Sequence, residues 1–363
     1  MRTGRQPLTI LVFCPNLVGD TAMATPAFRA IRQGYPDARL VAVIKPKVAA
    51  TLDGSPWFDA VVRFDPKSRR REERSLAVVR RLRRERADVA VLFPNSVRSA
   101  LMALAAGAKR RVGYDRGGRG WLLTDRLEPI RDGRGGFKPS PIVDAYLKLA
   151  EALGCVGDGP RLELGTTPDD EAAADRAWAG LGLPRDRPVV ALNTGGAFGP
   201  AKSWPEEHFA ALARRLVAEA DVGGVLVVCG PGERDAARRI VALADDPRVV
   251  SLADQAMGIG LTKASIRRSS LLVTTDSGPR HFGVAFDVPT LGLFGPTHIA
   301  WTLTHHAKSL HVHHPVPCGP CQRPTCAERH HRCLRDLGPD AVFAAACRML
   351  AGRQPLGERS EAV

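Results

Sequence analysis

The sequence has no apolar run long enough to cross a bilayer. Its first apolar segment, Leu8–Phe13, is too short for the core of a signal peptide, so we expect a cytoplasmic protein. The patterns GxxxxGKS and GxxxxGKT, which cradle phosphates in P-loop proteins, are also absent. The sequence therefore indicates neither a membrane-spanning protein nor a P-loop enzyme.

Acidic residues are few compared with basic ones: 38 Asp and Glu stand against 52 Lys and Arg, which gives a formal charge of +14. This excess favours an anionic partner such as a nucleic acid, a nucleotide, a phosphorylated glycolipid or a membrane surface. However, the most basic segment, Lys67–Arg86, lacks interleaved aromatic side chains for base stacking, and no nucleic-acid-binding module is recognised. A basic nucleic-acid-binding protein is therefore the weaker alternative, and we expect no nucleic-acid partner.

A chain of 363 residues is natural for two domains. Short apolar runs alternate with helix-compatible segments in two series, a pattern typical of α/β domains with doubly wound parallel sheets. The predicted strands are 8–13, 39–44, 60–64, 88–93 and 109–114, then 189–193, 224–229, 248–252, 271–273, 289–294 and 309–313. The Gly- and Pro-rich segment 155–168 interrupts the alternation, so we predict domains 1–165 and 166–340, followed by a C-terminal helix and tail, 341–363.

Three further segments complete the predicted organisation. The apolar side chains of residues 21–33 repeat with helical spacing, which predicts one helix. The segments 116–120 and 131–141 are rich in Gly, Arg and Pro and are predicted to be loops.

Ligands of doubly wound sheets bind beyond the carboxyl ends of the strands. Asp276, Ser277 and Gly278 follow the apolar run Leu271–Val273 and precede a helix-compatible segment that contains His281. Such a turn either binds an anion through its backbone N–H groups or simply caps the helix with Asp276 or Ser277. Both interpretations remain open from the turn alone.

Three other loops also follow predicted strands. The turn Thr194, Gly195 and Gly196 leaves the backbone free to wrap an anion, and Lys202 adds a positive charge. Glu233 either accepts hydrogen bonds from ribose hydroxyls or favours the start of a helix. Asp20 is either a helix cap or a general base. Because three of the four loops lie in the second half, we expect that half to hold a nucleotide and Asp20 to act from the first half.

The chain closely resembles glycosyltransferase family nine, the ADP-heptose heptosyltransferases of lipopolysaccharide core synthesis. The resemblance rests on VFCPNLVGD, AKSWPEEHF, CGPGER and TTDSGPRHFGVAFDVPTLGLFGPT, and extends over nearly the whole chain. PNSVRSALMALAAGAKRRVGYDRGGRGWLLTDRL and CGPCQRPTCAERHHRCL look most like the heptosyltransferase II subgroup. One departure is Leu17, where the family often has Trp.

The resemblance implies a GT-B fold and an inverting transfer, without a required cofactor or metal, from ADP-L-glycero-beta-D-manno-heptose to the inner core of lipopolysaccharide. It implies a peripheral location on the inner face of the cytoplasmic membrane. It assigns the general base to Asp20, phosphate neutralisation to Lys202, ribose binding to Glu233, and the pyrophosphate side to Asp276, Ser277, Gly278 and His281. A same-fold enzyme using another nucleotide sugar remains the alternative, because no residue specifies heptose by itself.

The basic loops of the first half are the expected site for the anionic lipid A–core acceptor. Arg side chains bind phosphates and carboxylates through paired hydrogen bonds, and polybasic loops also favour an anionic bilayer. The alternative is a solvated surface. The expected acceptor-binding residues are Lys67, Arg69, Arg70, Arg116 and Arg119.

The cysteines form two groups. Cys14, Cys155, Cys229 and Cys347 are scattered and are expected to be reduced thiols in or near the core. The clustered ones are candidates for a structural zinc site, although their spacing after the first CxxC pair is not that of a standard knuckle, and reduced thiols in a loop are the alternative. The clustered thiols are Cys318, Cys321, Cys326 and Cys333. Five nearby histidines are expected on the surface or in packing positions: His305, His306, His311, His313 and His314.

Overall fold

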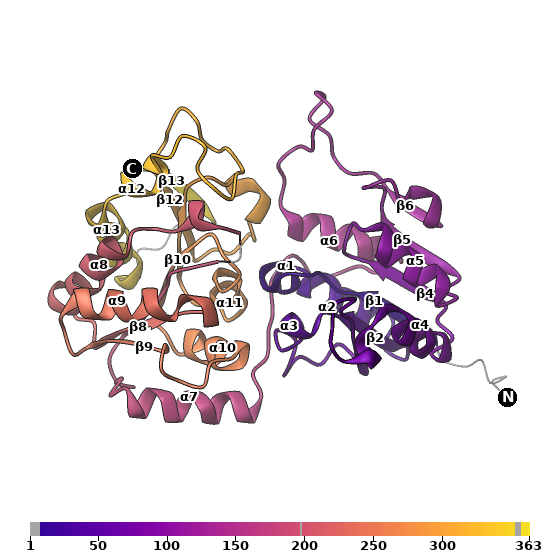
Figure 1. Cartoon of the computed structure of the whole chain (residues 1–363), viewed down its shortest axis with the longest axis horizontal. Helices are drawn as coiled ribbons and strands as arrows, with labels where there is room; N and C mark the ends of the chain where they lie inside the picture. The colour runs from indigo at the N-terminus through magenta and orange to yellow at the C-terminus, as the bar shows by residue number, and fades with distance from the viewer. Residues whose placement is uncertain (1–7, 197, 353–356) are drawn as a thin grey trace. The chain divides into compact units, whose positions relative to one another are not determined.

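The computed structural model describes residues 8–196, 198–352 and 357–363. The chain divides into two compact units, with unit 1 ending at Glu163 and unit 2 beginning at Leu164. Each unit is built around one parallel sheet with helices on both of its faces (Figure 1). The α/β architecture predicted from the sequence is therefore confirmed.

Unit 1 has a six-stranded sheet in the order β3-β2-β1-β4-β5-β6. Its strands are β1 Thr9–Phe13, β2 Arg39–Ile44, β3 Ala60–Arg63, β4 Val89–Leu92, β5 Arg110–Tyr114 and β6 Asp125–Leu127. Its helices are α1 Val18–Met23, α2 Thr25–Gly34, α3 Pro46–Ala49, α4 Ser75–Arg84, α5 Val97–Ala105 and α6 Ile142–Glu151.

The central strands of unit 1 are apolar on both faces because each face is covered by helices. Ile10 and Val12 face one cluster, which includes side chains of α2 and α6. Leu11 and Phe13 face the other cluster, which includes side chains of α4 and α5. The alternation along β1 thus builds two cores from one five-residue run.

Two features of unit 1 differ from the sequence prediction. The helix predicted over 21–33 consists of two helices, α1 and α2, which meet at Ala24. Pro26 stands in the first turn of α2, where its missing N–H is tolerated because that position needs no intrahelical partner. The segment after the predicted loop 116–120 forms the short edge strand β6, which lacks an apolar pattern.

Unit 2 has a seven-stranded sheet in the order β13-β12-β11-β10-β7-β8-β9. Its strands are β7 Val189–Asn193, β8 Gly224–Val228, β9 Val249–Ser251, β10 Leu271–Thr275, β11 Thr290–Phe294, β12 Ser309–His313 and β13 Arg359–Ala362. Its helices are α7 Pro168–Gly180, α8 Glu206–Glu219, α9 Arg234–Ala244, α10 Ile259–Arg267, α11 Arg280–Ala285, α12 Arg332–Arg335 and α13 Pro339–Leu350.

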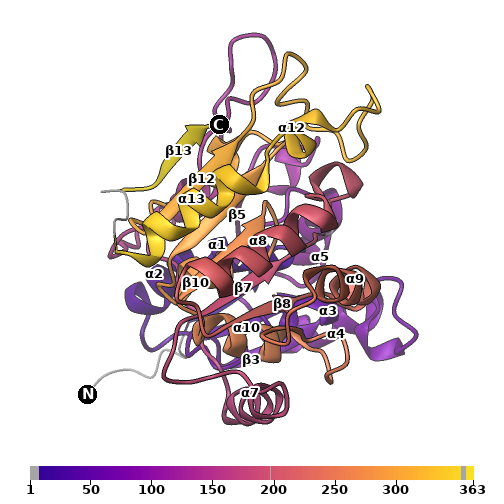
Figure 2. The same cartoon turned by 90° about the vertical axis from the view of Figure 1, so that its left-hand side faces the viewer.

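The helices of unit 2 form two layers. Figure 2 shows α8, α9 and α13 in front of the sheet, and their apolar side chains share one core with β7, β8 and β10. On the opposite face Leu272 of β10 packs against Gly283 of α11. The start of α7 is fixed by a capping box in which Thr167 and Asp170 bind each other's backbone N–H groups.

Strand β13 was missing from the sequence prediction, which treated 341–363 as a helix and tail. It pairs in parallel with β12, so that Leu310 lies opposite Arg359 and His313 opposite Ala362. The sequence RSEA has no apolar alternation, and its place in the sheet is set by the strand beside it. Within the described residues, no helix is long and apolar enough to cross a membrane.

Candidate active site

The order of the second sheet places β7 between β10 and β8, so the chain reverses its direction of winding between β7 and β10. Ligands of doubly wound sheets bind at the carboxyl end of this switch point. Here Asn193, the last residue of β7, donates from Nδ2 to the hydroxyls of Thr274 at 2.9 Å and Ser277 at 2.7 Å. Asn193 was not singled out in the sequence, although a polar residue at the end of a buried strand is a usable signal.

Lys202 and Asp276 form the central charged pair of the site. Lys202 Nζ lies 2.6 Å from Asp276 Oδ2 and 3.0 Å from the Asp276 carbonyl oxygen. The Thr297 hydroxyl donates to the same Oδ2 at 2.7 Å. Burial raises the pKa of Asp276, but the charges of Lys202 and Arg280 outweigh it and hold the pKa below its ordinary value. Asp276 is therefore an anion at neutral pH, and Lys202 a partly exposed cation beside it.

The predicted turn Thr194-Gly195-Gly196 lies between the other two loops. A Cβ atom on Gly195 would stand 2.0 Å from Glu233 Oε1, and one on Gly196 would stand 2.9 Å from Cβ of Ser277. Side chains at either position would therefore displace Glu233 or Ser277. The structure thus brings the loops after β7, β8 and β10 together, as their adjacency in the sheet requires.

Glu233 has a second role within its own loop. Its carboxylate accepts the backbone N–H of Gly230 at 2.7 Å, which stabilises the turn before α9. The helix-start interpretation of Glu233 is therefore confirmed, while its proximity to Gly195 keeps its other oxygen close to the predicted nucleotide loop.

The alternative that Asp276 or Ser277 caps α11 is wrong, since the capping residue is Pro279 and no side chain caps this helix. The N–H groups of Arg280 and His281 donate to the carbonyls of Ser277 and Gly278. In residues 8–196, 198–352 and 357–363, the N–H groups of Ser277 and Gly278 find no backbone or side-chain acceptor. The turn thus holds two backbone donors without an acceptor in the described part of the chain, and an anionic side chain paired with Lys202.

His281 is almost fully buried, at 2% exposure. Burial and then the charge of Arg280 lower its pKa well below the ordinary value, so the imidazole is neutral at pH 7. Its Nδ1 has no hydrogen-bond partner in the described part of the chain. His281 therefore places a buried, unpaired ring nitrogen in the helix that follows the Asp276 turn.

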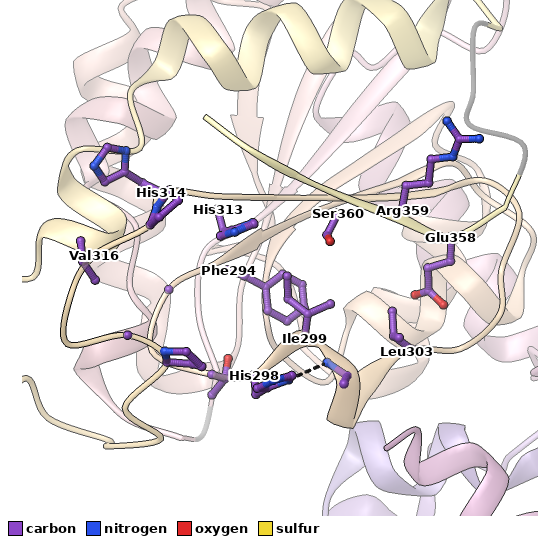
Figure 3. Close-up of a pocket in the computed structure, with 16 residues that line it drawn as sticks. Phe294, His298, Ile299, Leu303, His313, His314, Val316, Glu358, Arg359 and Ser360 are labelled. Atoms are coloured by element: carbon purple, nitrogen blue, oxygen red, sulfur yellow. Dashed lines mark hydrogen bonds between the residues drawn. The ribbon is translucent and has the colours of Figure 1, made fainter. Parts of the chain in front are cut away.

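Beside this turn lies a cavity of about 470 Å³ at the carboxyl ends of β11 and β12 (Figure 3). Thr297, whose hydroxyl binds Asp276, is one of its lining residues. Apolar walls come from Phe294, Ile299 and Leu303, and Figure 3 shows the Glu358 carboxylate near Leu303. The expectation that His311 is a surface or packing residue is incomplete, because it is fully buried and bonded to Glu358 at 2.8 Å.

In unit 1, Asp20 lies within α1, and the residue before this helix, Leu17, makes no side-chain cap. The helix-cap interpretation of Asp20 is therefore wrong. Burial and then the charge of Asp20 raise the pKa of Tyr146 on α6, while Arg116 lowers it. The charges of Asp20 and Arg116 thus both act on Tyr146, which sequence reasoning missed. Leu17, the residue before α1, is half exposed.

Arg119 does not belong to an accessible basic surface. Its side chain is fully buried and donates to the carbonyls of Tyr114 and Pro94 and to Oδ1 of Asn95. Burial lowers its pKa to about 10, which still leaves it charged at neutral pH. Arg119 therefore anchors the loop after β5 from within, and the expectation that it contacts the acceptor is corrected.

The other basic candidates are accessible to different degrees. Lys67, Arg69 and Arg70 are exposed on the loop between β3 and α4. Arg116 is half-buried, and its guanidinium stacks 3.6 Å above the ring of Phe137. These side chains extend from loops that follow the carboxyl ends of β3 and β5.

The possible structural zinc site, to which reduced thiols were the alternative, is not assembled. Among the described residues, which include all of 318–333, no group of three or more His, Cys, Asp or Glu is placed to hold a metal ion. Cys318 Sγ lies 3.7 Å from Nε2 of His330, and all eight cysteines are free. Burial and then the neighbouring thiols raise the pKa of Cys333 to about 11. The scattered cysteines are also reduced, and Cys14, Cys155 and Cys229 are buried as expected.

Comparison with known proteins agrees with this geometry. Lipopolysaccharide heptosyltransferase 2 of Escherichia coli K12 is 28% identical over 360 residues, which cover 93% of this chain and 97% of that protein. The structure of E. coli ADP-heptose lps heptosyltransferase II matches with a TM-score of 0.77 and 24% identity over 95% of this chain and 99% of the other. The structure of E. coli heptosyltransferase WaaC with ADP-2-deoxy-2-fluoro heptose matches with a TM-score of 0.69 and 17% identity, over 93% of this chain and 99% of the other. These likenesses show a GT-B fold.

The family assignment rests on a match to a family model. The model of glycosyltransferase family 9 (heptosyltransferase) matches residues 75–331, more than half of the chain. That span contains the turns of Gly195, Glu233 and Asp276, which the fold brings together at one sheet edge. The chain is therefore a glycosyltransferase and belongs to glycosyltransferase family 9, the heptosyltransferases.

Proposed function

We propose that this protein transfers heptose from ADP-L-glycero-beta-D-manno-heptose to the inner core of lipopolysaccharide, with inversion at the anomeric carbon. The observation that carries this proposal is the Lys202–Asp276 pair at the switch point of the second sheet, 2.6 Å apart, with the Gly195 turn and Glu233 beside it. Its heptosyltransferase 2 relative and the WaaC structure with an ADP-heptose analogue support the choice of donor.

The donor would be held by groups of unit 2. Lys202 neutralises phosphate charge, the N–H groups of Ser277 and Gly278 donate to phosphate oxygens, and Glu233 accepts from the ribose. The flexible backbone of Gly195 and Gly196, with Thr194 before them, wraps the nucleotide. Neutral His281 acts as a hydrogen-bonding group rather than as a second cation.

The reaction needs a base in addition to a donor site. The acceptor hydroxyl oxygen attacks the anomeric carbon while Asp20 takes the hydroxyl proton, and the bond from that carbon to the ADP oxygen breaks. ADP leaves with the bonding electron pair, so its terminal phosphate gains negative charge. Lys202 stabilises this charge as it forms. In this proposal the transfer requires no divalent cation.

The acceptor is proposed to be a lipid A–core glycolipid on the inner face of the cytoplasmic membrane, where the protein binds peripherally. Its phosphates and sugar carboxylates suit the guanidinium groups of Arg69, Arg70 and Arg116 and the ammonium of Lys67. Exposed basic side chains gain roughly 1 kcal/mol each near an anionic bilayer.

The test of this function is turnover of ADP-heptose against ADP-glucose and UDP-glucose, with a lipid A–core acceptor. Only ADP-heptose is expected to give a product of increased mass, at the same rate with and without EDTA. Preference for another nucleotide sugar would favour the same-fold alternative, and strict dependence on a divalent cation would contradict the metal-free mechanism.

Replacing Arg69, Arg70 and Arg116 together by Gln is expected to raise the acceptor KM severalfold and leave the donor KM nearly unchanged. The effect should shrink in high salt, because exposed charges are screened within about 10 Å at 0.1 M ionic strength. Steady-state kinetics with each substrate varied in turn measures both constants.

The matched control for this variant is Arg80 and Arg84 changed to Gln on the exposed face of α4, which removes charge from the same basic stretch. The control should leave both KM values unchanged. An equal effect of the control, or an equal rise in the donor KM, would place the acceptor site elsewhere.

A further inference from the structure

A second buried charged pair lies behind the Lys202–Asp276 pair. Arg280, fully buried on α11, extends between two carboxylates: its Nε is 4.0 Å from Asp276 Oδ1 and its Nη1 is 3.9 Å from Glu358 Oε1. Its Nη2 donates to the carbonyl of Thr302. Lys202, Asp276, Arg280 and Glu358 therefore form a chain of alternating charges that runs inward from the partly exposed Lys202.

Glu358 is held by several hydrogen bonds at the inner end of this chain. Its Oε2 accepts the backbone N–H groups of Thr304 and His305, both at 2.6 Å, and its Oε1 accepts from the Thr304 hydroxyl at 3.2 Å. His311 Nε2 lies 2.8 Å from Oε1. Burial raises the pKa of Glu358, but the hydrogen bond from His311 and the nearby charges lower it to about 2.

The two imidazoles near this chain add no charge. Burial lowers the pKa of His311, although its hydrogen bond to Glu358 opposes the shift, and burial also lowers the pKa of His281. The two anions therefore balance the two cations, Lys202 and Arg280. Because an unpaired buried charge is costly, removal of the Glu358 charge would leave Arg280 with one carboxylate partner, Asp276, among the described residues.

Glu358 comes from outside the recognised family match, which ends at residue 331. It immediately precedes β13, whose parallel pairing with β12 places Arg359 opposite Leu310. The pairing of β13 with β12 at the edge of the sheet thus places the Glu358 carboxylate close to the buried guanidinium of Arg280. Figure 3 shows the Glu358 side chain directed from this strand towards Leu303.

We propose that Glu358 is a positioning residue for transfer: it holds Arg280, which fixes the Asp276 carboxylate and so sets the place of Lys202 beside the leaving phosphate. This inference rests on the proposed function. Without the Glu358 charge, Arg280 draws Asp276 away from Lys202. Binding of ADP in the ground state should persist, because the change removes a negative charge, that of Glu358. However, the Lys202 ammonium no longer lies where the leaving phosphate gains negative charge. Small displacements of this kind cost large factors in rate.

The test compares the full-length wild type with E358Q and E358D in ADP titration and in heptose transfer. E358Q keeps the shape of the side chain and loses its charge, whereas E358D keeps the charge. We expect E358Q to bind one ADP per chain with an affinity within a few-fold of wild type, and to transfer roughly 10- to 100-fold more slowly. E358D should recover a large part of this rate.

The matched control is E361Q, which removes an exposed carboxylate from the same strand, where it pairs with Arg348 at 2.7 Å. It should transfer at the wild-type rate. A wild-type rate for E358Q, or a loss of ADP stoichiometry in proportion to the loss of rate, would overturn the inference, since the second result shows a role in folding only. A wild type that turns over no ADP-heptose would instead overturn the proposed function, and this inference with it.

A measurement on the wild type covers the case in which E358Q does not fold. If the charged chain couples the donor site to Glu358, saturating ADP should slow hydrogen exchange of the Thr304 and His305 amides, which both donate to Glu358. Exchange at these amides that is unchanged by ADP, in a protein that binds ADP, would contradict the coupling.

Discussion

Replacing Asp20 by Ala is expected to lower kcat by roughly 100- to 10,000-fold, the usual cost of removing a general base. The side chain lies on α1, after the carboxyl end of β1, and Asp20 is not the N-cap residue of that helix. Burial and then the charge of Asp20 raise the pKa of Tyr146 on α6 of the same unit. Donor binding should change little, since the proposed donor groups all lie in unit 2.

The measurement is transfer rate together with ADP affinity, for Asp20→Ala and for Asp37→Ala as control. Asp37 is an exposed carboxylate of the same unit that precedes β2, at the amino end of the strands. The control should keep full activity. If Asp20→Ala transfers at the wild-type rate, another group is the base and Asp20 has a structural role.

The second large effect is expected for Lys202→Ala, which should reduce kcat/KM for the donor by roughly 100-fold or more. Phosphate charge is present in bound ADP-heptose and grows as ADP leaves, so both KM and kcat should worsen. The change also removes the 2.6 Å partner of buried Asp276, whose pKa should then rise. Lys202→Arg keeps the positive charge and should retain more activity than Lys202→Ala.

Kinetics and thermal unfolding should be measured together, because loss of one partner of a buried ion pair also destabilises a fold. Lys308→Ala is the control, as it removes the ammonium that pairs with Asp287 at the surface of the same unit. A lower Tm for Lys202→Ala with unchanged kinetics of the remaining folded protein would show that the pair is structural only.

Much of the fold was predictable because parallel strands buried on both faces consist of consecutive apolar residues. Strands β2, β7 and β12 have the bounds predicted from the sequence, since polar or turn-forming residues border each run. β6 and β13 were missed because DRL and RSEA show no apolar period. Such edge strands form because they make hydrogen bonds with the adjacent strand, β5 or β12, and this pairing leaves no pattern in their own sequence.

The same division applies to the candidate site. Asp276, Ser277 and His281 are close in sequence and could be grouped from it, whereas Lys202 meets Asp276 from 74 residues away because β7 and β10 are neighbours in the sheet. A sequence shows that a residue is charged but not which charges will be buried together. The burial of Arg119 among carbonyl groups corrected one prediction for this reason.

The sequence by itself determined the fold class, the loops that follow the strands and the family resemblance, because each depends on residue type and short-range spacing. Only the tertiary structure decided that Lys202, Asp276, Arg280 and Glu358 form one chain of alternating charges, which runs inward from the partly exposed Lys202. The physical reason is that electrostatic pairing depends on distance and burial in space. Both are set here by the order of the strands, which places β7 beside β10 and β13 beside β12.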